Sequence, residues 1–310
     1  MLWTVFAIVV LAMLALDLGV LHRNPHEVKL REALTWSAVW IGLALAFLVL
    51  VYAWRGQRVS LEFLTCYLIE ESLSVDNLFV FLVIFSYFNV PKHLHHKVLF
   101  WGIVGAVVMR AAFIVVGVAV IERFAWLIYV LGGLLIVTGI RMAMPGEREI
   151  HPERNPVLRL FRRMFPVTDD YDGDRFFVRR AARIFATPLF VVLLVVETTD
   201  VAFAIDSVPA ALSISLDPFV VFTSNIFAIL GLRSLYFALA GIMPMFVYLH
   251  YGLSVILVFT GVKMIAAHWV RIPIGVALGV VAGVLAISVV MSLMRSKRMQ
   301  KEGAGESFGA

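Results

Sequence analysis

The sequence predicts an all-α polytopic membrane protein with about nine transmembrane helices. Hydrophobic residues make up 62% of the 310-residue chain, charged residues only 15%, and the mean hydropathy is +0.95. Soluble domains contain about 45–50% apolar and about 25% charged residues. A second observation is a series of apolar runs long enough to cross the roughly 30 Å hydrocarbon core of a bilayer. A third is an internal repeat of three such runs.

Nine apolar runs of membrane-spanning length divide the chain. They cover residues 2–21, 34–54, 62–86, 98–121, 124–144, 187–213, 217–240, 246–268 and 272–294. The first has no basic residue before it and lacks a small-residue cleavage pattern, so we interpret it as a retained helix rather than a signal peptide. The whole chain, 1–310, is expected to form a single membrane domain.

Lysine and arginine are distributed unevenly between the loops. With the N-terminus outside, the inside loops and the tail 295–310 hold 18 of the 26 basic residues, and the outside loops hold four. Because basic residues prefer cytoplasmic loops, we expect a periplasmic N-terminus and a cytoplasmic C-terminus. This asymmetry also explains the net charge of +5 without nucleic acid as a partner.

Residues 145–186 form the one long loop, which this topology places in the cytoplasm. Its stretch 154–165 mixes arginines with apolar residues, which is typical of a helix on an anionic leaflet; a solvated connector is equally compatible. The acidic segment 168–174 invites comparison with a calcium-binding loop. Its key positions would be Thr168 and Arg179, which are unsuitable ligands, so a polar turn is predicted.

The internal repeat relates residues 62–144 to residues 187–268. Three markers recur in the same order: Ser74–Leu78 with Ala204–Val208, Arg110 with Arg233, and Thr138–Gly139 with Thr260–Gly261. Each copy holds three predicted helices, so the two copies enter the membrane from opposite sides and are inverted. Inverted repeats of this kind are common in secondary transporters, whose ion sites lie near the bilayer midplane.

Six carboxylates lie inside the apolar runs: Glu70, Glu71, Asp76, Glu197, Asp200 and Asp206. A carboxylate at that depth costs about 2.5–3.5 kcal/mol on insertion scales, so we expect these residues to be functional. The mid-span bases Arg110 and Arg233 would leave four negative charges unbalanced, and these require protons or bound cations. The alternative is that the acids pair with the two arginines and only hold the helices together.

The ligand types favour a hard divalent cation. Carboxylates are joined by amide and hydroxyl groups at Asn77 and Ser207, without nearby cysteine or histidine, which suits Mg²⁺, Ca²⁺ or Mn²⁺. Asp206 lies about 120° around an ideal helix from Asp200, so regular helices would not bring all the acids together. Pro209 cannot donate a hydrogen bond, and we therefore expect a break in the helix beside Asp206.

Two motifs resemble the signature motifs of the TerC family. They are Glu-Glu-Ser-Leu-Ser-Val-Asp-Asn-Leu-Phe-Val-Phe at 70–81 and Glu-Thr-Thr-Asp-Val-Ala-Phe-Ala-Ile-Asp-Ser-Val-Pro-Ala at 197–210. Residues 217–233 resemble the family's next segment. The similarity covers nearly the whole chain and is greatest to Alx-type members. Glu71 is a departure, because related members can carry lysine at that position.

The resemblance implies an exporter of Mn²⁺ in the bacterial inner membrane. Our leading hypothesis is a secondary transporter that exchanges the ion for protons, with no enzymatic activity and no cofactor besides the transported ion. The ion-handling positions implied by the motifs are Glu70, Asp76, Asn77, Glu197, Asp200, Asp206 and Ser207. The chain has no phosphate-binding loop of the ATPase type, which argues against a built-in ATPase. The alternative is a membrane scaffold of a tellurium- or stress-resistance complex that docks partners on loop 145–186.

Overall fold

The computed structural model is built almost entirely from helices. It describes residues 3, 4, 6, 8, 10, 30–124, 126–144, 155–180, 183–242, 248–267, 269–270 and 272–306. Six helices in these ranges are long and apolar enough to cross a membrane, and one further apolar helix has 17 residues. The chain is therefore an all-α membrane protein. The first predicted span, 2–21, lies largely outside the described residues, so the total of nine helices stays a prediction.

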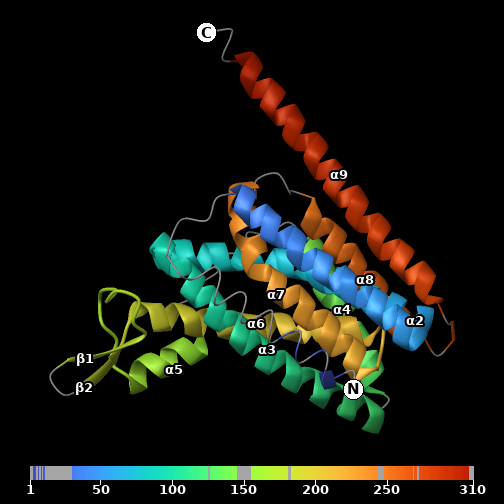
Figure 1. Ribbon diagram of the computed structural model, residues 1–310, viewed down its shortest axis with the longest axis horizontal. Coiled ribbons are helices and arrows are strands. Elements are labelled where there is room, and N and C mark those ends of the chain that lie inside the picture. Colours follow the sequence, from blue (N-terminus) through green and yellow to red (C-terminus); the bar gives the residue numbers. More distant parts are fainter. Residues whose placement is uncertain are drawn as a thin grey trace.

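The elements follow one another as helices with one small hairpin in the middle of the chain (Figure 1). In order they are α2 (Leu30–Tyr87), α3 (Lys92–Arg123), α4 (Leu127–Ala143), α5 (Pro156–Met164), β1 (Phe177–Arg180), β2 (Arg183–Ala186), α6 (Pro188–Leu212), α7 (Pro218–Ile242), α8 (Leu249–Ala266) and α9 (Ile274–Glu306). Each predicted span from 34–54 onward coincides with one of these helices or with half of α2.

Helix α2 contains two membrane-length helices that meet at Gly56. Gly56 has φ of 84°, a left-handed conformation that side chains rarely tolerate, and it interrupts the helical backbone there. The rings of Phe47 and Phe63 have centroids 5.5 Å apart. In a straight helix these residues would be about 24 Å apart, so the chain reverses direction at the glycine. The predicted spans 34–54 and 62–86 are thus joined without a loop.

Helices α4 and α8 pack closely and antiparallel, with small residues between them. A Cβ atom added to Gly139 would lie 2.9 Å from the carbonyl oxygen of Ser254, and one added to Gly261 would lie 2.6 Å from that of Gly132. The Ser254 hydroxyl also donates to the Gly139 carbonyl at 2.6 Å. Close backbone approach of this kind is typical of helix pairs in membranes. Lipid provides no hydrophobic driving force between helices, so their association depends on close packing at small residues.

We expect Gly139→Leu to destabilise the protein by about 1–3 kcal/mol, the usual cost of overpacking. The added side chain would separate α4 from α8 at their closest approach. Gly133→Leu is the matched control on the same helix, because a Cβ atom at Gly133 meets nothing within 4 Å. The melting temperature of detergent-solubilised protein is the measurement. Equal melting temperatures for the two variants would contradict this packing.

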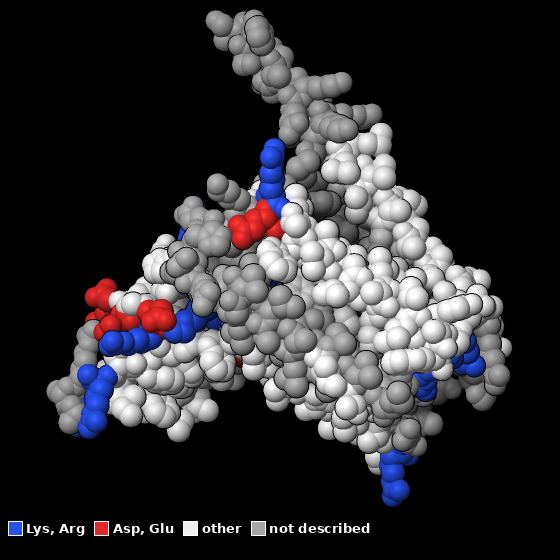
Figure 2. Space-filling model, in the orientation of Figure 1, with Lys and Arg blue, Asp and Glu red and all other residues white. Residues whose placement is uncertain are grey.

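Residues 155–180 and 183–186 are folded against the helices rather than free. Asn155 caps α5, and its side chain accepts hydrogen bonds from the backbone of Val157 and Leu158. Charged side chains gather near β1 and β2 on the face shown in Figure 2, while the body of the bundle is mainly uncharged on that face. This distribution fits a helical body embedded in lipid with a polar segment at one end.

Two contacts attach the turn before the hairpin to the ends of α2 and α3. The Tyr171 hydroxyl donates to the Phe88 carbonyl at 2.8 Å, and burial raises the pKa of Tyr171 to about 12. Lys97 Nζ lies 2.8 Å from an Asp174 carboxylate oxygen and lowers the pKa of that carboxyl below its ordinary value. Tyr171 and Asp174 therefore attach this segment to the helices.

Candidate functional site

Arg110 lies fully buried where four helices meet. It extends from α3, and its Nη1 donates to the Glu70 carboxylate on α2, to Ser207 Oγ on α6 at 3.0 Å and to Asn225 Oδ1 on α7 at 2.7 Å. Its Nη2 lies 3.6 Å from Asp200 Oδ1 on α6. One guanidinium thus joins an acid from each copy of the predicted repeat. The one positive charge of Arg110 and the two negative charges of Glu70 and Asp200 leave the cluster with one formal negative charge.

The groups around Arg110 are incompletely paired. Buried side-chain atoms without a hydrogen-bond partner in the described part of the chain include Glu70 Oε2, Asp200 Oδ2, Asn225 Nδ2, and Nε and Nη2 of Arg110. Further along the same face of α2, Ser74 Oγ and Asn77 Nδ2 are also buried and unpartnered. Buried polar atoms are paired in most proteins, so such a concentration marks a site with capacity for another ligand.

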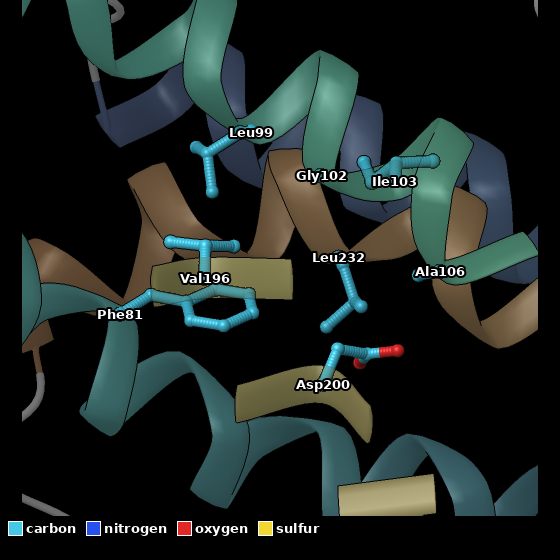
Figure 3. A pocket seen from close by; sticks show the side chains of 8 residues that line it. All are labelled: Phe81, Leu99, Gly102, Ile103, Ala106, Val196, Asp200 and Leu232. Carbon is cyan, nitrogen blue, oxygen red and sulfur yellow. The ribbon is translucent and has the colours of Figure 1, made fainter. Parts of the chain in front are cut away.

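A small pocket opens beside Asp200, between α2, α3, α6 and α7 (Figure 3). It has room for about one water molecule. Its other lining residues are all apolar: Phe81, Leu99, Gly102, Ile103, Ala106, Val196 and Leu232. In Figure 3 the Asp200 carboxylate lies at the edge of this group, beside Leu232. The acid therefore borders an otherwise apolar hollow, where its charge is poorly solvated.

Glu197, three residues before Asp200 on α6, is half-buried against α3. Its carboxylate occupies the position that a Cβ atom at Gly105 would need, so the absence of a side chain at Gly105 makes room for this acid. Neither Gly105 nor Asn225 was predicted as a site residue from the sequence. Asn225 could have been found as a polar residue inside an apolar run, whereas no local signal distinguishes Gly105 from other glycines.

Asp206 lies apart from the Arg110 cluster. Its carboxylate accepts a hydrogen bond from Thr138 Oγ1 on α4 at 3.0 Å. The predicted break beside Asp206 is absent, because α6 stays helical through Pro209 to Leu212. Pro209 stands three residues from the end of α6, so it removes one backbone hydrogen bond near a terminus rather than dividing the helix.

The chain has relatives among known bacterial membrane proteins. Residues 55–300 match the family described as "Integral membrane protein TerC family". The chain belongs to the TerC family. An uncharacterized membrane protein of Myxococcus xanthus, STKORF319, is 52% identical over 96% of this chain and 93% of its own length. A protein of Escherichia coli K12 named as a proposed membrane-bound redox modulator, Alx, is 44% identical over 98% of both chains. No solved structure matches the chain.

The predicted TerC-motif residues divide into groups in this structure. Glu70, Asp200 and Ser207 come together around Arg110, Asn77 is buried on the face of α2 that carries Glu70, and Glu197 lies one turn before Asp200. Asp206 is separate, and the side chain of Asp76 lies outside the description. Within the described residues, no three histidine, cysteine or acidic side chains are grouped closely enough to hold a metal ion. In this conformation the predicted ligands are therefore not all gathered at one point, since Asp206 lies apart from the group around Arg110.

Proposed function

We propose that this TerC-family chain is a secondary transporter that exports a divalent metal cation, Mn²⁺, across the bacterial inner membrane in exchange for protons. The observation that carries the proposal is the buried pair of Glu70 and Asp200, each with one oxygen lacking a hydrogen-bond partner. Carboxylate, amide and hydroxyl oxygens are the ligands that hard divalent ions prefer. Buried acids in a membrane mark ion pathways in many transporters.

Arg110 stands in this conformation where a cation would bind. Its single positive charge offsets half of the charge on Glu70 and Asp200, whereas a divalent ion between the carboxylates would offset all of it. Ion binding would then require the guanidinium to withdraw, because two cations in one buried site repel. Exchange between an arginine-bound and an ion-bound state would give the transporter two states in which different cations balance the same acids, and ion binding would shift the population between them.

The packing of α4 against α8 supports the inverted repeat, while the distribution of basic residues between the loops supports the nine-helix topology with a periplasmic N-terminus. The alignment of Thr138–Gly139 with Thr260–Gly261 makes Gly132 the counterpart of Ser254. A two-fold axis that exchanges the copies would place Ser254 at the position of Gly132 and Gly139 at that of Gly261. The contact between Gly132 and Gly261 then predicts a contact between Ser254 and Gly139, and the structure contains both. Paired contacts of this kind are expected of two copies related by a two-fold axis in the membrane plane.

The pocket beside Asp200 supports access from the cytoplasmic side. Phe81 lies six residues from the end of α2 and Leu99 seven residues from the start of α3, and the predicted topology places both helix ends at the cytoplasm. The pocket thus extends from the acid toward the side from which an exporter loads its ion. Rearrangement of α2 and α3 there would open a path to Asp200.

Everted membrane vesicles test the proposal against the scaffold alternative. Vesicles from cells that express this protein should take up Mn²⁺ when an inside-acid proton gradient is imposed, and a proton ionophore should abolish the uptake. Replacement of residues 155–180 by a flexible linker distinguishes the transporter from the scaffold. It removes the docking surface that a scaffold needs, whereas the buried acids of the transporter remain. Uptake that is absent in wild-type vesicles, together with stress resistance that depends only on this segment, would contradict the transporter proposal.

Asp206→Asn is expected to leave the protein level unchanged and to reduce Mn²⁺ efflux by about ten-fold, since a charge-assisted contact contributes about 1.5–3 kcal/mol. An asparagine side chain keeps the shape and can still accept the Thr138 hydrogen bond. Immunoblots beside efflux measurements distinguish this from a structural role. If the level fell and adding Arg233→Gln restored it, Asp206 would be half of an ion pair rather than an ion ligand.

A further inference from the structure

Helix α5 presents three faces with different chemistry. At 100° per residue, its side chains separate into a face toward α6, an exposed apolar face and a basic face. The face toward α6 contains Leu158, which is 3% exposed, and Phe161, whose ring lies 5.3 Å from that of Phe190. The exposed apolar face contains Val157, Leu160 and Met164, and the basic face contains Arg159, Arg162 and Arg163.

Contacts with α6 fix the depth at which α5 lies. Asn155 Nδ2 donates to Thr198 Oγ1 at 2.7 Å, and the ring of Phe177 on β1 lies 4.5 Å from that of Phe190. Thr198 is ten residues into α6, about 15 Å along its axis from Pro188. Helix α5 therefore lies alongside the first part of a membrane-spanning helix, as Figure 1 shows.

The exposed apolar face at this position requires a cover other than water. Leu160 is 59% exposed and Met164 68% exposed, and both belong to a helix held against the end of a membrane span. Acyl chains surround such a span at this depth. The basic residues of α5 stand beside the apolar ones, and the helix contains no acidic residue. In the acidic segment before the hairpin, the carboxylate of Asp174 is engaged by Lys97.

We propose that α5 binds the anionic phospholipids of the cytoplasmic leaflet, with Leu160 and Met164 among the acyl chains and Arg159 and Arg163 on headgroup phosphates. Amphipathic helices with basic polar faces bind at this boundary, and their affinity rises with the anionic lipid content. The proposal concerns lipid of the surrounding bilayer rather than free phosphate. It does not depend on which ion the protein moves.

Lipid binding at α5 would also affect α6, the helix that carries Glu197 and Asp200. The Asn155–Thr198 hydrogen bond ties the start of α5 to the residue next to Glu197 on α6. A leaflet that holds α5 therefore also holds this part of α6. Asn155 is a positioning residue in this arrangement, because it acts on Glu197 only through the backbone of α6.

Spin labelling in vesicles tests where α5 lies. Cys66 is the single cysteine, so Cys66→Ser gives a background for single labels introduced by Leu160→Cys, Met164→Cys and Arg163→Cys. In full-length protein reconstituted into phosphatidylglycerol–phosphatidylcholine vesicles, the labels at 160 and 164 should collide with oxygen more than with a water-soluble nickel chelate. The label at 163 should show the opposite preference. Equal nickel accessibility at all three positions would overturn the proposal and indicate a solvated face.

Lipid headgroup charge gives an independent test. The wild-type melting temperature should be higher in phosphatidylglycerol nanodiscs than in phosphatidylcholine nanodiscs by about 2–4 °C. Arg159→Gln with Arg163→Gln should remove that difference, whereas the matched pair Arg179→Gln with Arg183→Gln on the hairpin should retain it. Adding inorganic phosphate to phosphatidylcholine nanodiscs should not reproduce it. A difference lost equally in both pairs, or reproduced by phosphate, would overturn the assignment to α5 and bilayer lipid.

Discussion

Arg110→Gln is expected to remove most of the folded protein from the membrane. The substitution leaves the carboxylates of Glu70 and Asp200 buried together without their shared cation. Removing one partner of a buried ion pair typically costs about 3–5 kcal/mol, a large part of the stability of most proteins. The measurement is the amount of monodisperse protein recovered from membranes, by immunoblot and by size-exclusion chromatography of a fluorescent fusion.

A second substitution identifies the cause of that loss. Glu70→Gln added to Arg110→Gln returns the cluster to the single negative charge of the wild type, so it should restore a substantial part of the protein level. Arg123→Gln serves as a control at an exposed arginine on the same helix and should leave the level unchanged. A normal level of the Arg110→Gln protein would mean that the arginine does not balance these acids.

Glu70→Gln alone is expected to preserve the fold and abolish export. The amide oxygen can still accept a hydrogen bond from Arg110, which also keeps Asp200 and Asn225 as partners. The variant loses one anionic ligand, and charge-assisted contacts contribute about 1.5–3 kcal/mol, so Mn²⁺ efflux should fall by about ten-fold or more. Efflux of Mn²⁺ from loaded cells, normalised to protein level, is the measurement.

Glu62→Gln is the matched control for Glu70→Gln. It makes the same chemical change on α2 at a partly buried carboxylate that contacts Ser215 at 2.8 Å and Arg58 at 3.1 Å, away from the Arg110 cluster. Its efflux should stay within about two-fold of wild type, because Glu62 lies outside the Arg110 cluster and its ion-pair partner Arg58 is exposed, which makes that pair weak. An equal loss in both variants would show that neutralising any acid of α2 impairs the protein and would remove the special role of Glu70.

Much of the candidate site could be predicted because its signals are local. A carboxylate inside an apolar run is visible in any window of the sequence, and this is how Glu70 and Asp200 were found. Their pairing with Arg110 corresponds to the alternative interpretation, in which the mid-span arginines balance the acids. Asn225 and Gly105 depend instead on which helices pack together, and a single sequence contains little information about that.

The differences from prediction have local physical causes. We expected a short outside loop between spans 34–54 and 62–86, but Gly56 reverses the chain in one residue because it can adopt a positive φ. We expected a break at Asp206, but Pro209 is close enough to the end of α6 for the helix to tolerate it. The family assignment was confirmed, since long motifs are more specific than composition or periodicity.

Transport by the purified protein tests the central claim most directly. The protein would be reconstituted into liposomes containing a Mn²⁺-sensitive dye, and an inside-acid proton gradient would be imposed. We predict Mn²⁺ uptake that requires the gradient, is abolished by Glu70→Gln and is retained by Glu62→Gln. Liposomes contain no cellular partners, so a scaffold could not move the ion. A wild-type signal equal to that of protein-free liposomes would contradict the claim that this chain transports Mn²⁺.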